Sequence, residues 1–442
     1  MATLCLASQV KGSIHKQPIP HRIGELKTSL SSTVKPFIQE LEKLPMRIDV
    51  SKTIKSVTLR ILDAFVDSVF QFVDQPVLPS QRNFVPVEEI GHIAQIEGIV
   101  GEIPADFPEG VYIRNGANPL WGGLKSTISV FGKSSHVWVE GEGMLHALYF
   151  SKDTNGNWSF AYNNRFVEPK TFKMEKQRNK PSYLPAVEGD SPAILAAFVL
   201  NALRFGDVNK ILSNTSVFEH GGKYYSIAEN YLAQEIDISS LSTLDDWDLG
   251  GAWGRPFTTH PKKAPGSGEL VIMGVDAVKP YYVVGVISAD GKKLIHKADV
   301  KLKRSTLAHE IGITQNQPPI DLCLLNVIEL CLSHPRYLGY LVSPICDVFA
   351  FKGHFGNPIK MEHHKFAKNN FCTGSAYVSK PGGSEEDDGW IVAYVHDEDT
   401  DTSHVIVVDA KNFQGEPIAK IPLPQRVPYG HHGAYFQTPS QH

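Results

Sequence analysis

Three histidines stand beside β-rich segments, where a rigid scaffold could aim their side chains at one point. They are His260 in RPFTTHPKK, His309 in TLAHEIGIT and His432 in VPYGHHGAYF. Neutral imidazoles bind iron, zinc or copper, and a site made only of histidines leaves the metal its full charge. With open positions for O2, such a site would suit redox chemistry on iron(II).

Most histidines bind no metal, and this chain has 18 of them. The adjacent pair His431 and His432 follows a turn at Pro428–Gly430, and it could be an exposed polar pair or could supply a metal ligand. The three candidate ligands are far apart in the sequence. Only a closed fold with a central axis would bring them together, and a β-propeller is such a fold.

The composition is that of a globular protein. The chain has 442 residues, of which 42% are hydrophobic, and a formal net charge of -4. This length allows two ordinary domains or one large all-β domain. The near balance of charge argues against nucleic acid as a partner. The five cysteines form no CxxC pair, which argues against a zinc knuckle and favours a reducing compartment.

Two segments have the pattern of helices. In SKTIKSVTLRILDAFVDSVFQFVD (51–74), apolar residues that include Phe65 and Phe70 recur at i, i+3 and i+4, and basic residues cluster at the start. This pattern suits a helix lying on a membrane surface, and a helix packed on a protein core is the competing interpretation. The more apolar PAILAAFVLNALRF (192–205) could cover a core or dip into lipid.

No apolar run approaches the roughly 18 residues that a membrane span needs.

The remaining sequence has the pattern of short strands separated by Gly, Pro, Asn and Asp turns. The segments DTNGN and SADGK are typical hairpin turns between such strands. Many short strands at this spacing predict an all-β sandwich, barrel or propeller, and the chain length favours a propeller. No regular blade repeat is visible, so periodicity alone does not decide among these folds.

The N-terminal segment has no acidic residue before Glu25 and carries Ser, Thr, Lys and Arg. Residues 1–45 are therefore interpreted as a plastid transit peptide, with a plain disordered tail as the alternative. The expected location is the plastid, either in the stroma or at the surface of a plastoglobule or thylakoid. The cytoplasm is the alternative location.

Eight motifs follow one another along the chain: EIPADFPEGVYIRNGANPLWGG, HVWVEGEGMLHALYF, YNNRFVEPK, NTSVFEHGGKYYSIAEN, TTHPKK, LAHEIGIT, EEDDGWIVAYVHDEDT and RVPYGHHGAYF. In this order they resemble the motifs of the carotenoid cleavage dioxygenase (carotenoid oxygenase) family, over about residues 78 to 436. The chain is most similar to plant members of the carotenoid 9,10-cleavage type. The resemblance implies that 46–442 form a single domain, a seven-bladed β-propeller with a helical cap.

The resemblance also implies a metal site on the propeller axis, where the family holds one non-haem Fe(2+) per subunit through four histidines. His260, His309 and His432 match three of these ligands by position. His431 takes the place of the aromatic residue that normally precedes the last ligand. Glu229 in SIAEN matches a family glutamate that hydrogen-bonds a ligand imidazole and fixes its orientation.

The chain departs from the family pattern around 317–355. The family motif of the remaining histidine has no counterpart there, since His334 and His354 are nearest by position but lack its context. The apolar segment 321–346 is either a divergent helix or the product of a wrong exon join. Gly374 stands where many family members carry another glutamate of the same kind. The missing strands would remove most of one or two blades, and three histidines could still hold iron with weaker affinity.

The function that the resemblance implies is that of an oxidoreductase, an iron(II)-dependent dioxygenase. It would cleave a conjugated double bond of carotenoids or apocarotenoids with O2 and give aldehyde or ketone apocarotenoids. A helix at a peripheral membrane surface, near 51–74, would let these apolar substrates reach the site without crossing water. Two alternatives stay open. One is a catalytically impaired relative, divergent or mis-spliced, that binds an apocarotenoid or nothing. The other is a metal-dependent hydrolase on the same histidines.

Overall fold

The computed structural model describes the chain from residue 50 onward, with gaps. The described residues are 50–137, 139–229, 231–254, 257–275, 281–300, 310–312, 323–325, 347–352, 360–430 and 432–438. The chain forms two compact units. The first is made of Met1–Asp74, Lys125–Val137 and Tyr183–Asn209, and the second is made of Gln75–Leu124, Trp138–Ser182 and Lys210–His442.

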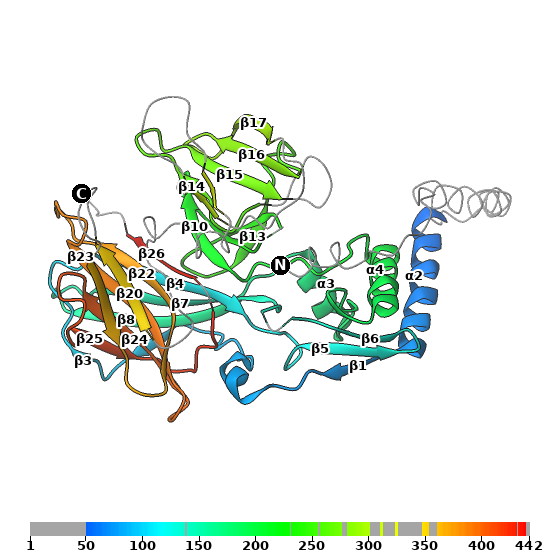
Figure 1. The fold of residues 1–442 in the computed structure, drawn as a ribbon, viewed down its shortest axis with the longest axis horizontal. Helices are drawn as coiled ribbons and strands as arrows, with labels where there is room; N and C mark the ends of the chain where they lie inside the picture. The colour runs from blue at the N-terminus through cyan, green and yellow to red at the C-terminus, as the bar shows by residue number, and fades with distance from the viewer. Residues whose placement is uncertain are drawn as a thin grey trace. The chain divides into compact units, whose positions relative to one another are not determined.

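The first unit combines two helices with a small antiparallel sheet of strand order β1-β5-β6-β9. Its elements are α2 (Val50–Val69), β1 (Phe70–Asp74), β5 (Lys125–Ser129), β6 (Gly132–Ser135), β9 (Glu188–Gly189) and α4 (Ser191–Phe205). The two helices lie side by side (Figure 1). Side chains from both of them, including Val66 and Leu200, meet in one apolar core.

Both predicted helices form, but the first is shorter than predicted. The predicted 192–205 helix is confirmed as α4, which has a proline in its first turn and ends at Gly206 with a left-handed φ of 83°. The last five residues of the predicted 51–74 helix form β1 instead, because they pair antiparallel with β5. Helical periodicity does not reveal this long-range pairing. As a result Phe70, expected on the apolar face of a helix, is buried in the core.

The second unit contains two five-stranded sheets. The first, the β4 sheet, has the order β2-β8-β7-β4-β26, with β2 (Ala94–Ile96), β8 (Trp158–Phe166), β7 (Gly143–Lys152), β4 (Gly110–Ala117) and β26 (His432–Gln437). The second, the β23 sheet, has the order β22-β23-β24-β25-β3, with β22 (Asn370–Ser379), β23 (Gly389–Asp397), β24 (Thr402–Asp409), β25 (Ala419–Pro422) and β3 (Val100–Gly101). Each sheet thus includes an edge strand that is distant in the sequence from the strand it pairs with, since β26 pairs with β4 and β3 pairs with β25.

Two four-stranded sheets and two strand pairs complete the β-structure that is described. The β11 sheet contains β10 (Ser216–His220), β11 (Lys223–Ile227), β12 (Ala233–Ile236) and β13 (Thr243–Trp247). The β15 sheet contains β14 (Lys262–Lys263), β15 (Leu270–Val275), β16 (Tyr282–Ile287) and β17 (Leu294–Val300). The pairs are β18 (Glu310–Gly312) with β19 (Cys323–Leu325), and β20 (Asp347–Lys352) with β21 (Lys360–Lys365). The helices of this unit are η2 (Pro79–Phe84) and α3 (Lys170–Arg178).

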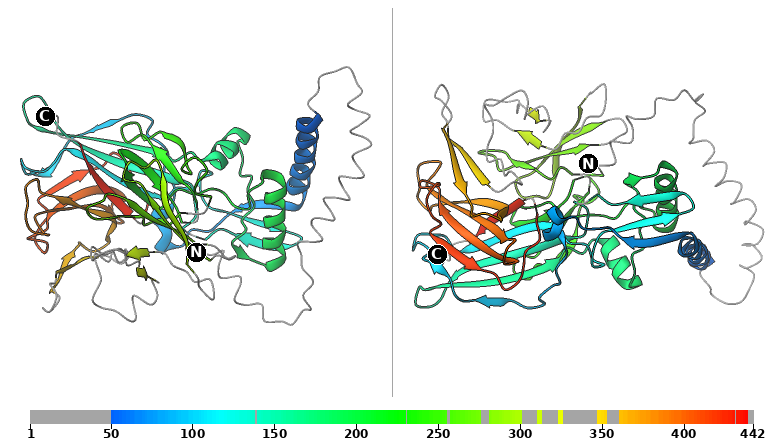
Figure 2. Two further views of the ribbon diagram at one scale, coloured as in Figure 1. Left: turned by 90° about the horizontal axis from the view of Figure 1, so that it is seen from above. Right: turned by 60° about the horizontal axis from the view of Figure 1, so that its bottom comes forward.

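Successive sheets of the second unit pack face to face through apolar cores. On β4, Tyr112 enters the core shared with the β23 sheet, whereas Val111 and Ile113 enter the core shared with the β11 sheet. The other face of the β11 sheet packs on the β15 sheet, through residues such as Trp247 and Ile272. In Figure 2 the orange and red C-terminal strands lie against the cyan and green strands of the β4 sheet. A strand that is buried on both faces needs no polar face, which explains the long runs of apolar residues in the sequences of these strands.

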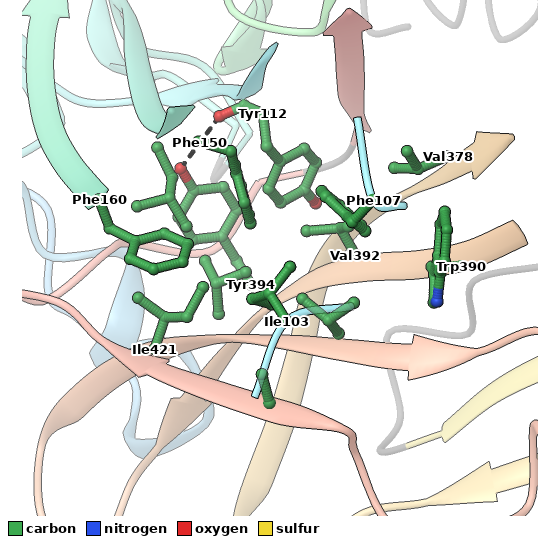
Figure 3. Packing of buried hydrophobic residues seen from close by; sticks show 14 of the residues in the cluster. Ile103, Phe107, Tyr112, Phe150, Phe160, Val378, Trp390, Val392, Tyr394 and Ile421 are labelled. Atoms are coloured by element: carbon green, nitrogen blue, oxygen red, sulfur yellow. Dashed lines mark hydrogen bonds between the residues drawn. The ribbon is translucent and has the colours of Figure 1, made fainter. Parts of the chain in front are cut away.

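Aromatic side chains dominate the core between the β4 sheet and the β23 sheet, which Figure 3 shows. The rings of Tyr112 and Tyr394 stack at 4.9 Å between centroids, and the Tyr394 hydroxyl donates a hydrogen bond to the Tyr112 carbonyl at 3.5 Å. Phe107 contacts Trp390 at 5.0 Å and Phe150 at 5.2 Å. Such ring pairs add about 0.5–1.5 kcal/mol each beyond the burial of their area.

The prediction of an all-β propeller with a helical cap is confirmed in part, since the described residues form mostly strands with few helices, whereas the seven blades stay a prediction. Both predicted hairpins are also confirmed, since DTNGN joins β7 to β8 and SADGK joins β16 to β17. Gly156 and Gly291 supply the left-handed turn residues, with φ of 83° and 71°. Within the described part of the chain, no helix is long and apolar enough to cross a membrane.

Candidate metal centre

His432 is the first residue of β26. This strand pairs antiparallel with β4, and His432 stands opposite Asn115 in the register. The turn that precedes it is tied to β22, because the Gly430 N–H donates to the Thr373 hydroxyl at 2.7 Å. The half-buried histidine is therefore held between a fixed turn and a paired strand.

His260 follows two buried threonines, Thr258 and Thr259, in the connection between β13 and β14. The Thr259 carbonyl accepts a hydrogen bond from the hydroxyl of Ser216 at 2.7 Å. The Thr259 N–H and hydroxyl donate to the Glu229 carboxylate at 3.2 and 2.8 Å. The backbone that carries His260 is thus tied to β10 and to the residues that follow β11.

The imidazoles of His260 and His432 meet, although they come from distant parts of the chain. Their ring centroids are 4.6 Å apart and the ring planes are inclined by 81°. Two imidazoles that bind one metal at right angles, each through a nitrogen about 2.1 Å from it, have centroids roughly 4.5 Å apart. Both side chains are half-buried. The donor type and the distance between the ring centroids therefore fit a shared metal ion.

Glu229 lies beside this pair. Its described hydrogen bonds go to Thr259, the residue before His260. The carboxylate thus fixes the position of the segment that carries His260, which is one way to orient a metal ligand. The direct bond to a ligand imidazole that the resemblance implies stays a prediction.

The other histidines of interest, His309, His334, His354 and His431, lie outside the described residues. Within the described ranges, no group of three or more His, Cys, Asp and Glu residues could hold a metal ion. The assignment of His260, His309 and His432 as ligands, and the choice of His432 over its neighbour, therefore stay predictions.

A polar network supports the strands on which the two histidines depend, and the sequence did not single it out. The side-chain N–H2 group of Asn115 donates to the carbonyls of Ser213 and Ser216 and to the hydroxyl of Ser226, at 2.9 to 3.3 Å. All four side chains are buried. Since Asn115 stands opposite His432 and Ser216 bonds to Thr259, the network joins the two ligand segments. The only sequence signal was the position of Asn115 in the motif YIRNGAN.

If His260 is a ligand to iron, as predicted, replacing Glu229 with glutamine is expected to weaken iron binding about 10–100-fold. The amide keeps the size of the side chain but loses the charge that receives two hydrogen bonds from Thr259. Iron affinity can be measured by competition with a chromophoric chelator. The control is Glu235→Gln, which removes a surface ion pair with Lys223 and should leave iron affinity unchanged. Equal weakening in both variants would show that Glu229 has no special role.

The comparison with protein families shows a match over two segments of the chain. The model of the retinal pigment epithelial membrane protein family matches residues 84–317 and 355–437, which is more than half of the chain. The matched residues include Glu229, His260, His309 and His432. The residues between 317 and 355 are left out of the match.

Curated relatives carry the names of carotenoid-cleaving enzymes. Carotenoid 9,10(9',10')-cleavage dioxygenase 1 of Pisum sativum is 23% identical over 548 aligned positions, covering 91% of this chain and 97% of the relative. The probable carotenoid cleavage dioxygenase 4, chloroplastic, of Arabidopsis thaliana is 24% identical over 516 positions, covering 84% of each chain. An alignment of 548 positions exceeds the 442 residues of this chain, so the Pisum sativum relative has residues with no counterpart here.

Solved structures share the fold. The lignostilbene dioxygenase of Pseudomonas brassicacearum has a TM-score of 0.62 at 16% identity, covering 83% of this chain and 100% of that chain. The cobalt-substituted Synechocystis ACO has a TM-score of 0.60 at 16% identity, covering 81% and 98%. By its family match and its relatives, the chain belongs to the retinal pigment epithelial membrane protein family, the carotenoid oxygenases.

Proposed function

We propose that this chain is an iron(II)-dependent dioxygenase that cleaves a conjugated double bond of carotenoids or apocarotenoids. Each carbon of the cleaved bond takes one oxygen atom of O2, and the products are aldehyde or ketone apocarotenoids. The observation that carries this proposal is the convergence of His260 and His432, with ring centroids 4.6 Å apart, in a member of the carotenoid oxygenase family.

His260, His309 and His432 would hold the iron on the axis of a propeller that is seven-bladed in the family. The bound iron(II) would supply the binding and activation of O2. The task of the protein is to orient the imidazoles. The Glu229–Thr259 hydrogen bonds position His260, and the pairing of β26 with β4 positions His432. The apolar cores on both faces of the β4 sheet keep water away from this support.

A peripheral membrane surface is the proposed source of substrate, since carotenoids dissolve in lipid. In the first unit, apolar side chains of both helices are exposed to solvent: Val57, Ile61 and Phe65 on α2, and Leu195, Phe198, Val199 and Leu203 on α4. The opposite sides of the same helices pack in the core of the unit. An apolar outer face on two adjacent helices suits insertion into the headgroup region of a bilayer. In this proposal the helices combine both roles that the sequence left open, since packing in the core is observed and membrane contact is proposed.

The double variant Ile61→Asp/Leu203→Asp is expected to release the protein from lipid vesicles, because each change puts a charge into the proposed lipid-facing surface. These side chains are 65% and 63% exposed, so the fold should be kept. Vesicle flotation measures binding, and iron content serves as the check on the fold. The control Leu244→Asp changes an exposed residue of β13, 54% accessible, and should bind vesicles as the native protein does. Undiminished flotation of the double variant would exclude these helices as the contact.

Plastid localisation belongs to the same proposal. Several relatives are named chloroplastic, among them the Arabidopsis thaliana protein described above. Residues 1–45, interpreted as a transit peptide, lie outside the described residues. Expression of the full chain with a C-terminal fluorescent tag in leaf cells would test the interpretation, with plastid fluorescence expected and diffuse cytoplasmic fluorescence against it.

The activity is tested on the full chain in detergent under 18O2. The expected result is one iron per chain and two carbonyl products from a carotenoid or apocarotenoid, each carrying one labelled oxygen. Anaerobic samples should leave the polyene intact. Folded protein that holds iron and leaves both substrate classes intact in air would refute the dioxygenase.

A catalytically impaired relative is the second candidate, and two observations favour it. The family match is interrupted between residues 317 and 355, and that stretch contains β19 and β20, which pair with β18 before it and β21 after it. Gly374 stands where a family glutamate is expected, and a Cβ there would lie 3.0 Å from Cγ of Arg114. This candidate predicts a folded protein that binds apocarotenoid or nothing and consumes no O2. An oxygen electrode separates it from the active enzyme.

A further inference from the structure

Arg114 is a cation buried in the interior of the second unit. It lies on β4, on the face that packs against the β23 sheet, and its side chain is completely inaccessible to solvent. The residue opposite on β7 is His146, which is equally inaccessible. Two polar side chains therefore stand next to each other inside an otherwise aromatic core.

The hydrogen bonds of these two side chains leave a defined set of donors unused. Arg114 Nη1 donates to the hydroxyl of Thr373 at 3.3 Å. Its Nε and Nη2 have no hydrogen-bond partner in the part of the chain that the structure describes. These two nitrogens form the edge of the guanidinium that binds a carboxylate side-on, through two parallel N–H bonds. His146 Nδ1 is 2.7 Å from the Tyr162 hydroxyl, and its Nε2 likewise has no partner among the described residues.

The groups that stabilise the positive charge of Arg114 are neutral tyrosines. Burial lowers the pKa of its guanidinium to about 10, so the group stays charged at neutral pH. The ionisable groups that act in favour of this charge are Tyr394, Tyr162 and Tyr112, whose own pKa values burial raises. Burial also lowers the pKa of His146 well below its usual value, which keeps it neutral. A buried cation without a counter-charge is costly, so an anion here would stabilise the fold.

Glycines close the other side of the guanidinium. A Cβ at Gly116 would lie 2.8 Å from Arg114 Nη1 and 3.2 Å from Nη2, and a Cβ at Gly430 would overlap Nη1. At Gly374, a Cβ would lie 3.0 Å from Arg114 Cγ. The Nη1 end and the aliphatic stem are thus packed against backbone. Nε and Nη2, which donate to no described residue, are the nitrogens that remain for a hydrogen-bond partner.

We propose that Arg114 and His146 bind one small planar oxyanion of the carboxylate type, formate or bicarbonate, between the β4 sheet and the β23 sheet. Its oxygens accept from the Nε–H and Nη2–H groups of Arg114. One oxygen also accepts from the Nε2–H group of His146, whose Nδ1 accepts from the Tyr162 hydroxyl. Gly433 of β26 stands opposite Arg114 in the register, so the ion holds together the sheet edge that carries His432.

The test uses the full chain, exchanged into a buffer that contains chloride as its only small anion. Titration with 13C-formate or 13C-bicarbonate, followed by calorimetry and 13C NMR, is expected to show one saturable site per chain. The two titrations also tell which of the two anions is preferred. An ion that remains bound through purification would appear, at one per chain, in the NMR spectrum of an acid extract or as released CO2.

Arg114→Lys keeps the charge but loses the side-on edge, and it is expected to bind the anion about tenfold more weakly or worse. The matched control is Arg165→Lys on β8, whose guanidinium bonds to Ser240 and Ser242 elsewhere and whose replacement should leave binding unchanged. If Arg114→Lys does not fold, His146→Gln provides the comparison and should also weaken binding.

Three results would overturn the proposal. The first is native protein that neither binds nor retains either anion, which would leave only water at these donors. The second is binding that is equally tight in Arg114→Lys, or in His146→Gln where that variant is the comparison. The third is chloride that competes as strongly as formate, which would remove the requirement for a planar carboxylate group.

Discussion

Replacing His432 with alanine is expected to abolish iron binding, and His260→Ala is expected to do the same. The ring centroids are 4.6 Å apart and the ring planes are inclined by 81°. Each variant would therefore remove one ligand of the proposed metal site. Both side chains are half-buried. The backbone before His260 is held by the hydrogen bond from Ser216 to Thr259, and the turn before His432 is held by the bond from Gly430 to Thr373. The fold should therefore persist in both variants. Metal analysis after dialysis measures the iron, and circular dichroism measures the fold.

His431→Ala is the matched control, since it removes the histidine next to His432. It should retain most of the iron of the native protein. Complete loss of iron in His431→Ala with retention in His432→Ala would show that the wrong member of the pair was chosen. Iron at native levels in all three variants would place the metal elsewhere and would remove the observation on which the dioxygenase proposal rests.

Replacing Lys210 with methionine is expected to lower the free energy of unfolding by about 3–5 kcal/mol. The Lys210 ammonium contacts the carboxylates of Glu142 at 2.6 Å and Glu175 at 2.9 Å, and those side chains are only 5% and 1% exposed. Without the lysine, two buried carboxylates would remain near each other without a cation. Urea denaturation followed by tryptophan fluorescence measures the loss.

The surface pair of Lys263 and Glu219 provides the control for this prediction. Their nitrogen and oxygen are 2.7 Å apart, a distance similar to that in the buried group, but the side chains are 48% and 31% exposed. Lys263→Met should therefore cost less than about 1 kcal/mol. Similar losses in the two lysine variants would mean that burial does not control the strength of these ion pairs.

The effect of Lys210→Met should also depend on pH. Burial alone would raise the pKa of Glu142, but the Lys210 ammonium outweighs burial and holds that pKa below its usual value of 4.5. A carboxyl group whose pKa is depressed by folding contributes stability above its unfolded pKa, and this contribution is lost as the pH falls through the folded pKa. The stability difference between native protein and variant should therefore shrink below about pH 4.5. A difference that grows in acid would contradict this linkage.

The sequence predicted the features of this protein that depend on local patterns. The strands buried on both faces appear as long apolar runs, and the turns of DTNGN and SADGK appear as Asn-Gly and Asp-Gly pairs. Helix α4 has its proline at the start and a glycine at the end. The change from α2 to β1 at Phe70 was missed, because it depends on pairing with β5, which comes about fifty residues later.

The candidate site was predicted through family resemblance rather than from spacing. Nothing in the local sequence around His260 or His432 shows that their rings lie together, since that contact depends on the packing of whole sheets. The supporting contacts of Asn115 were missed for the same reason. Arg114 and Lys210 look like ordinary surface charges in the sequence, because their burial depends on residues that are distant along the chain.

The pairing of β26 with β4 has a consequence for biosynthesis. Strand β4 (Gly110–Ala117) leaves the ribosome long before its edge partner β26 (His432–Gln437). At about 5–20 residues per second, translation of the intervening chain lasts on the order of tens of seconds. During that time β4 has an unsatisfied edge and His432 does not yet exist. A metal site that includes His432 would therefore be completed only after β26 has been made.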